Sequence, residues 1–158
     1  MKRRGIFITS ILFIFLLLIG DMGFSADQTN LKDYKPKSPD EEAIVSLLNK
    51  WRDTWESGNV QGILNMLHDD AKIMYGGGPT PKQIATKEEA KTALPGDMAA
   101  ACCGLKLVTP KIDVSGKKAN VDILFVLTKG FHMQYDWPFM FNLVKENNRW
   151  LIMSWKYQ

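Results

Sequence analysis

The sequence has few of the residues that build metal and redox sites, because its 158 residues include only two histidines and two cysteines. His68 and His132 could each serve as a metal ligand or a proton shuttle. However, neither has a carboxylate or a second histidine at ligand spacing on the same segment. We therefore expect both to be exposed or to cap an element, and we predict no metal site and no cofactor.

The two cysteines are adjacent, as Cys102 and Cys103. In an oxidising compartment they could form a strained vicinal disulfide, an intermolecular disulfide or a soft-metal site with Met98. They could also be two small buried residues. We favour a structural role for the two cysteines, either as a buried pair or as a vicinal disulfide.

The chain also lacks a strong charge excess once its first residues are set aside. Residues 1–26 contain three basic residues and one acidic residue, so the remainder carries seventeen basic and sixteen acidic side chains. The basic pI of the whole chain therefore gives no reason to expect a nucleic-acid partner.

Residues 1–26 have the layout of a secretory signal peptide. Lys2, Arg3 and Arg4 precede an apolar run from Ile6 to Ile19, and small residues follow up to Ala26. Cleavage after Ser25 or Ala26 fits this pattern, and no cysteine that could carry a lipid follows the run. We expect an exported protein, periplasmic or secreted. The alternative is an uncleaved anchor that leaves the domain facing outside, which would be the chain's only contact with a membrane.

The rest of the chain divides into a linker at 27–37 and one domain at 38–158. The linker is polar and has no hydrophobic period. The length that remains suits one domain with one core.

Alternating apolar residues predict four long antiparallel strands in the last third of the chain, from Leu105 to Tyr157. Turns are expected at Ser115-Gly116, Lys129-Gly130 and Asn147-Asn148. Strands of this length predict a strongly curved sheet, and the hollow of such a sheet must be filled.

Three amphipathic helices and one short strand are predicted before this sheet. The first helix starts at the Ser38-Pro39 cap and ends at Gly58, the second runs from Asn59 to about His68, and the third runs from the Thr86 and Glu89 capping box to Leu94. Pro95-Gly96 is expected to stop the third helix. The short strand is expected at 71–75. The fold class is therefore α+β, with a curved antiparallel sheet wrapped around three helices.

This order of elements resembles the nuclear transport factor 2-like superfamily, the cone-shaped α+β barrel fold of the SnoaL-like polyketide cyclases and ketosteroid isomerase. The resemblance covers 41–157 and depends on the segments 51–55, 58–59, 69–71 and 148–152. It implies a deep pocket between sheet and helices, and a homodimer formed through the outer face of the sheet.

Polar residues that face this pocket would decide its chemistry. A regular hairpin at Asn147-Asn148 places Ser154 and Lys156 on the inner face, where SnoaL-like relatives often carry polar residues. Asp122 faces inward if the loop at Lys129-Gly130 has two residues, and outward if it has three. The apolar set Val121, Ile123, Phe125 and Leu127 favours the outward arrangement.

Aromatic residues are expected to form the core and to line part of the hollow, which suits a small apolar or aromatic ligand. The predicted ligand-binding residues are Trp51, Trp55, Tyr75, Tyr135, Trp137, Trp150 and Ser154. The favoured function is an exported domain that binds such a ligand or a partner protein. The alternative is a small isomerase, dehydratase or cyclase, with Asp122 or Lys156 as general base and Tyr135 as hydrogen-bond donor.

Overall fold

The computed structural model describes residues 28–77, 80–100, 104–129 and 133–157. The predicted signal peptide, Cys102, Cys103 and His132 lie outside these residues. None of the helices in the described ranges combines the length and the apolar character that a membrane crossing requires.

The three predicted helices are present as α2 (Pro39–Glu56), α3 (Val60–Leu64) and α4 (Lys87–Ala100). Their caps are those that the sequence indicates. The Ser38 hydroxyl accepts the Glu41 N–H, and the Asn59 side chain accepts the Gly62 N–H. At the start of α4 the Glu89 carboxylate accepts the Thr86 N–H at 2.8 Å. These bonds satisfy N–H groups that the first helical turn leaves unpaired.

The third helix is longer than predicted, because it continues through Pro95 to Ala100. Proline has no N–H to donate to the carbonyl four residues earlier, so the sequence predicts a stop there. Leu94 and Met98 are both buried on this helix, and burying the last turn outweighs the missing hydrogen bond.

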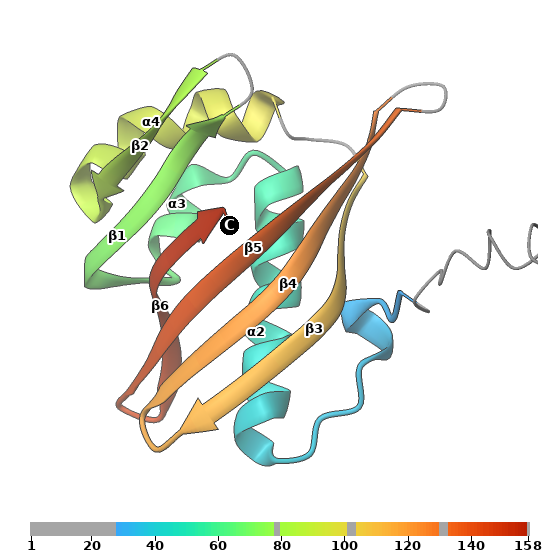
Figure 1. The fold of residues 1–158 in the computed structure, drawn as a ribbon. Helices are drawn as coiled ribbons and strands as arrows, with labels where there is room; N and C mark the ends of the chain where they lie inside the picture. The colour runs from blue at the N-terminus through green and yellow to red at the C-terminus, as the bar shows by residue number, and fades with distance from the viewer. Residues whose placement is uncertain (1–27, 78–79, 101–103, 130–132, 158) are drawn as a thin grey trace, which may run out of the picture.

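Six strands form one curved sheet that does not close, in the order β2-β1-β6-β5-β4-β3 (Figure 1). The bounds are β1 (Leu67–Gly77), β2 (Thr80–Thr86), β3 (Leu105–Ser115), β4 (Lys118–Lys129), β5 (Met133–Glu146) and β6 (Arg149–Tyr157). The four long strands at the C-terminal end of the chain are confirmed, and the register shifts once in the β3–β4 pairing and once in the β5–β6 pairing.

The predicted curved α+β sheet is confirmed, with one strand more than predicted and one parallel pair. The short strand expected at 71–75 is the longer β1, which pairs in parallel with β6. The missed strand, β2, lies at the edge of the sheet and contains Pro81, a residue that argues against a central strand but is tolerated at an edge.

Part of the segment predicted as a linker packs against the domain. Leu31 begins the 3₁₀ helix η1 (Leu31–Asp33) and is fully buried in the core. The Thr29 carbonyl accepts the Thr109 N–H at 2.7 Å, and Asn30 forms an antiparallel bridge with Val108. Asn30 and Leu31 therefore belong to the domain and cover part of the β3 edge.

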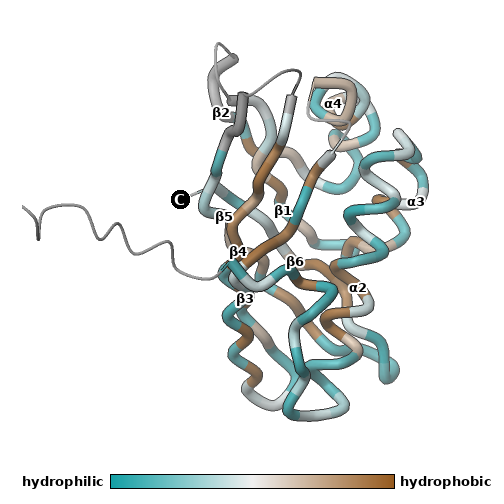
Figure 2. Tube along the Cα trace, turned by 90° about the vertical axis from the view of Figure 1, so that its right-hand side faces the viewer, coloured by the Kyte–Doolittle hydropathy of each residue, from teal (hydrophilic) through white to brown (hydrophobic). Residues whose placement is uncertain are grey.

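The helices lie against the inner face of the sheet, and the apolar residues gather between these layers (Figure 2). In the view of Figure 1, α2 lies behind β3, β4 and β5, so the viewer sees the outer face of these strands. The inner layer holds the candidate site.

Candidate functional site

Helix α2 carries two tryptophans into the space beneath the sheet. Ile44, Leu48, Trp51 and Trp55 recur at three- and four-residue spacing, which places them on one side of the helix. Trp51 is 0% exposed and Trp55 is 6% exposed. Their ring centroids lie 4.9 Å apart, so the two rings form one surface.

The sheet presents further rings to this surface. Phe125 and Phe139 stack at 4.0 Å between centroids, and the Trp155 ring meets Trp51 edge-on at 5.6 Å. We call the following residues the aromatic cluster: Trp51, Trp55, Phe125, Phe139, Phe141, Trp155 and Tyr157. The aromatic cluster fills the interior that the sequence predicted as a hollow.

Two indole N–H groups in the aromatic cluster have no acceptor. The Trp155 indole donates to the Met74 carbonyl at 2.7 Å. The indole nitrogens of Trp51 and Trp55 are buried and make no hydrogen bond with the described residues. A buried donor without a partner costs about 1–3 kcal/mol, so an acceptor supplied from outside the chain would relieve this cost.

A carboxylate and a phenol lie at one end of the aromatic cluster. Asp97, on α4, accepts the Gly76 N–H at 2.9 Å, and burial raises the pKa of its half-buried carboxyl. Burial and the nearby charge of Asp97 raise the pKa of Tyr157 to about 12. The Tyr157 ring contacts Phe139 edge-on at 5.0 Å. Asp97 therefore has an electrostatic connection, through Tyr157, to the aromatic cluster.

The sequence did not identify Asp97, because it placed this residue in a loop after Pro95-Gly96. One signal was available. If the helical spacing of Ala90 and Leu94 is continued, it reaches Asp97 and Met98 on the buried side of α4.

The predicted aromatic residues fall in different places. Trp51 and Trp55 belong to the aromatic cluster, whereas the Trp150 indole donates to Asp40 at 3.1 Å, at the start of α2. The Tyr75 hydroxyl donates to Gln83 on β2 at 2.6 Å. Trp137 is 39% exposed. The structure describes the backbone pairing of Tyr135 with Leu127 but not the Tyr135 side chain.

The predicted inward orientation of Ser154 and Lys156 was wrong. Leu143 pairs with Ile152 as expected, but Met153 is an extra residue, so that Asn142 rather than Phe141 pairs with Ser154. A one-residue shift moves each following side chain to the other face. Trp155 consequently lies inside, while Lys156 is exposed on the outer face.

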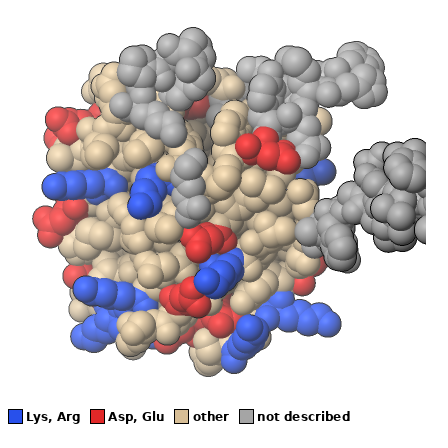
Figure 3. Space-filling model, in the orientation of Figure 1, with Lys and Arg blue, Asp and Glu red and all other residues tan. Residues whose placement is uncertain are grey.

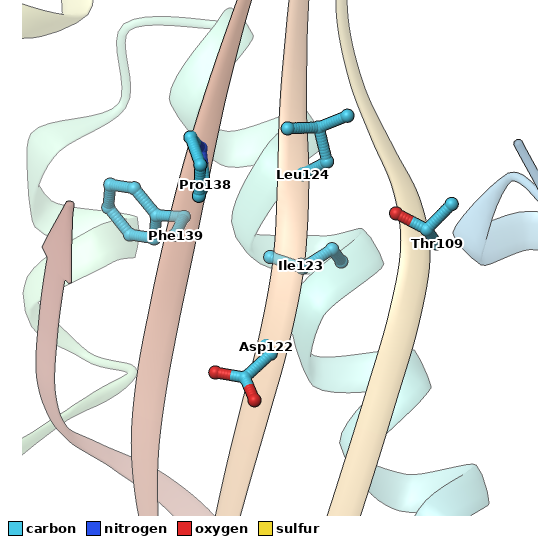
Figure 4. A pocket seen from close by; sticks show the side chains of 6 residues that line it. All are labelled: Thr109, Asp122, Ile123, Leu124, Pro138 and Phe139. Atoms are coloured by element: carbon cyan, nitrogen blue, oxygen red, sulfur yellow. The ribbon is translucent and has the colours of Figure 1, made fainter. Parts of the chain in front are cut away.

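Asp122 also faces away from the aromatic cluster. Asp122 pairs with Met140 and Val121 with Phe141, so the register differs from either predicted hairpin. Lys129, expected in the turn, is paired with Met133, although the outward orientation of Asp122 is the one that the sequence favoured. Figure 4 shows the Asp122 carboxylate on the side of the sheet opposite α2. It borders a shallow hollow of about 190 Å³ lined by Thr109, Asp122, Ile123, Leu124, Pro138 and Phe139.

His68 contacts two neighbouring groups through its ring nitrogens. Its Nδ1 accepts the Asp70 N–H, and its Nε2 lies 3.0 Å from the Glu146 carboxylate. Within the described ranges, no three His, Cys, Asp or Glu side chains come together as a metal site would require.

Comparisons with solved structures identify the fold. A protein of unknown function with a cystatin-like fold from Nostoc punctiforme matches with a TM-score of 0.64 and 14% identity, over 78% of this chain and 93% of that one. An NTF2-like protein from Cytophaga hutchinsonii matches with a TM-score of 0.62 and 12% identity, over 77% and 98% of the two chains.

A protein from Shewanella frigidimarina, named as a candidate ketosteroid isomerase, matches with a TM-score of 0.58 and 21% identity, over 73% of this chain and 94% of that one. No protein-family model and no curated protein matches the sequence. At these identities the similarity concerns the fold alone. The chain has the fold of the nuclear transport factor 2-like superfamily, as the order of its elements predicted.

Proposed function

We propose that this domain binds a small, flat and largely apolar molecule against the aromatic cluster, with the Trp55 indole as hydrogen-bond donor. The observation that carries the proposal is the pair of buried indole N–H groups without acceptors. Native structures rarely leave such donors unpaired. A ligand oxygen or ring nitrogen that accepts from Trp55 would satisfy one of them, and the surrounding rings would supply apolar contact.

The first experiment is a native mass spectrum of the protein purified from its own export pathway. A retained small molecule would appear as added mass, and the protein mass itself would report whether residues 1–25 or 1–26 have been removed. We propose such removal, and hence a periplasmic or secreted location, from the charged, apolar and small-residue order of this segment.

The Trp55→Phe variant separates a ligand contact from a purely structural role. The variant no longer leaves an indole donor unpaired, which favours stability by up to about 1–3 kcal/mol, and this gain is expected to offset part of the cost of the cavity left by the smaller ring. The affinity for the retained molecule is expected to fall about tenfold. Trp150→Phe is the matched control, since its indole already has Asp40 as a partner. Unchanged affinity in Trp55→Phe would contradict the proposed contact.

A second function, proton transfer in an isomerase or dehydratase, has one observation in its favour. Asp97 combines a raised pKa with the neighbouring Tyr157 hydroxyl, and a general base needs a pKa close to the working pH. The sequence proposed Asp122 or Lys156 as base and Tyr135 as donor, but the first two lie on the outer face. We therefore assign the base of this alternative to Asp97. Ligand C–H exchange in D₂O that is lost in Asp97→Asn would support it.

A further inference from the structure

A cavity outside the aromatic cluster lies where two hairpins of the sheet turn. It has a volume of about 510 Å³ and is lined by Gly116, Lys117, Lys145, Asn147 and Asn148. The β3–β4 turn and the β5–β6 turn lie side by side at the lower left of Figure 1, and the Lys145 N–H donates to the Lys117 carbonyl at 2.8 Å. Small-molecule sites occupy about 300–1,000 Å³, so the cavity is large enough for such a ligand.

The charged groups that line this cavity have one sign. Lys117 and Lys145 line it, and no carboxylate of the described residues does. The carboxylate of Glu146, which lies between Lys145 and Asn147 in the chain, is 3.0 Å from His68 instead. We propose that the cavity binds the phosphate group of a small soluble molecule, a function separate from binding at the aromatic cluster.

The two lysines contribute in different ways. The Lys145 ammonium donates to the Asp40 carboxylate at 2.5 Å and lies 5.9 Å from the centroid of the Trp150 ring. These contacts hold the ammonium in place and use one of its three N–H donors. The Lys117 ammonium makes no hydrogen bond or ion pair with the described residues. Because Asp40 balances the charge of Lys145, Lys117 supplies the net positive charge of the cavity.

The β5–β6 turn adds uncharged donors. Asn147 and Asn148 have φ values of 47° and 61°, the left-handed region that a type I′ hairpin turn requires. The side-chain amide of each carries two N–H donors. A phosphate group presents three strong acceptor oxygens, whereas a carboxylate presents two. Donors spread over two turns therefore suit a phosphate better than a carboxylate.

Three probes with the same carbon skeleton test this chemistry: glycerol 3-phosphate, glycerate and glycerol. Each is titrated into the protein at neutral pH and low salt while the amide chemical shifts are followed by NMR. Glycerol 3-phosphate is expected to shift the amide signals of residues 116–117 and 147–148. It is also expected to bind about tenfold more tightly than glycerate, which has fewer acceptor oxygens and less charge. Glycerol is expected to cause no shift.

Variants at the two turns test the residues. Lys117→Gln removes the unpaired charge and is expected to weaken glycerol 3-phosphate binding about tenfold. Lys118→Gln is the matched control and should bind normally, because Lys118 is an exposed lysine of the same hairpin that does not line the cavity. Asn148→Gly tolerates the positive φ and keeps the backbone N–H but loses the side-chain amide, so a smaller weakening is expected.

Three results would overturn the inference. Equal weakening in Lys117→Gln and Lys118→Gln would indicate attraction to general surface charge. Equal affinity for glycerol 3-phosphate and glycerate, or no shift at either turn, would contradict a phosphate site. Vesicles that contain phosphatidic acid present the same phosphate on a membrane. Vesicle binding that requires Lys117, without any binding of free glycerol 3-phosphate, would overturn the soluble ligand.

Discussion

The fold lowers the pKa of three carboxylates in this protein and raises the pKa of Asp97. Hydrogen bonds lower the pKa of Asp40, Asp69 and Glu89, with Lys145, Lys87 and the Thr86 backbone as the largest causes respectively. Burial has the opposite effect on Asp97. Partial burial of the Asp97 carboxylate costs free energy in the folded protein. Groups that are destabilised in this way are common at functional sites.

The pH dependence of stability tests this difference. Because the pKa of Asp97 is raised in the folded state, the folded state binds more protons than the unfolded state between the usual pKa and the raised value. The contribution of Asp97 to stability is therefore present at low pH and lost as the pH rises through this window. Asparagine does not titrate, so Asp97→Asn is expected to gain stability relative to wild type as the pH increases.

Urea unfolding at a series of pH values from about 3 to 8 measures this difference. Asp113→Asn serves as the control, because Asp113 is an exposed carboxylate on β3. A stability difference between wild type and Asp97→Asn that does not change with pH would contradict the assignment.

At the scale of elements, one extra residue in β6 determines which of the following side chains face the core and which face outward. Met153 is the extra residue in the β5–β6 pairing, and the residues after it are displaced by one position. The 2% exposed Trp155 owes its place in the core to this bulge. Alternation alone predicted a regular strand, which would have put Ser154 and Lys156 inside.

Deletion of Met153 is expected to cost less stability than the roughly 3–5 kcal/mol for loss of a large core aromatic residue, because the deletion removes only the extra residue of the pairing. Without Met153, Ser154 stays opposite Asn142 and Trp155 stays opposite Phe141, so Trp155 is expected to remain in the interior. Thermal unfolding followed by circular dichroism measures the change. Lys156→Ala, an exposed substitution on the same strand, should stay within about 0.5 kcal/mol of wild type. A deletion variant that unfolds would show that the bulge itself, and not only the pairing of Trp155 with Phe141, is needed for stability.

The whole molecule extends further toward the N-terminus than its sequence pattern indicates. Leu31 is 0% exposed, and the Thr29 carbonyl accepts a hydrogen bond from β3. The polar residues around Leu31 hide this contact from any periodicity argument. Only Asp27 and Gln28 separate a cleavage site after Ala26 from Thr29.

Two truncated proteins test this boundary. A chain of residues 27–158 is expected to be more stable than one of 38–158 by about 2–5 kcal/mol, the cost of emptying a buried leucine site. Leu31→Ala in the longer chain should reproduce most of the loss, and Lys32→Ala should not. Equal unfolding midpoints in urea for the two truncated chains would contradict a structural role for this segment.

The outer face of the sheet supports a proposal about assembly. Lys111, Asp122, Met140 and Lys156 lie side by side across β3, β4, β5 and β6. Figure 3 shows broad uncharged areas on this side of the molecule. A two-fold axis through the face would bring its acidic and basic positions opposite one another. We propose a homodimer formed through this face.

Leu124→Glu is expected to shift such a dimer to monomer, because Leu124 and Pro138 line the hollow on this face. Sedimentation velocity at several protein concentrations measures the change. Ile84→Glu is the matched control, since Ile84 is an exposed hydrophobic residue on the β2 edge. A wild-type protein that stays monomeric at all concentrations would contradict the proposed interface.

The sequence by itself determined the helix caps, the long C-terminal strands and the apolar side of α2, because each depends on residues close together in the chain. It also favoured the outward orientation of Asp122, although the register of β4 and β5 differs from the predicted one. Only the tertiary structure decided the places of Leu31, Asp97, Ser154 and Trp155. These depend on one bulge, on a helix that continues through Pro95 and on packing between distant segments, and local sequence patterns do not carry that information.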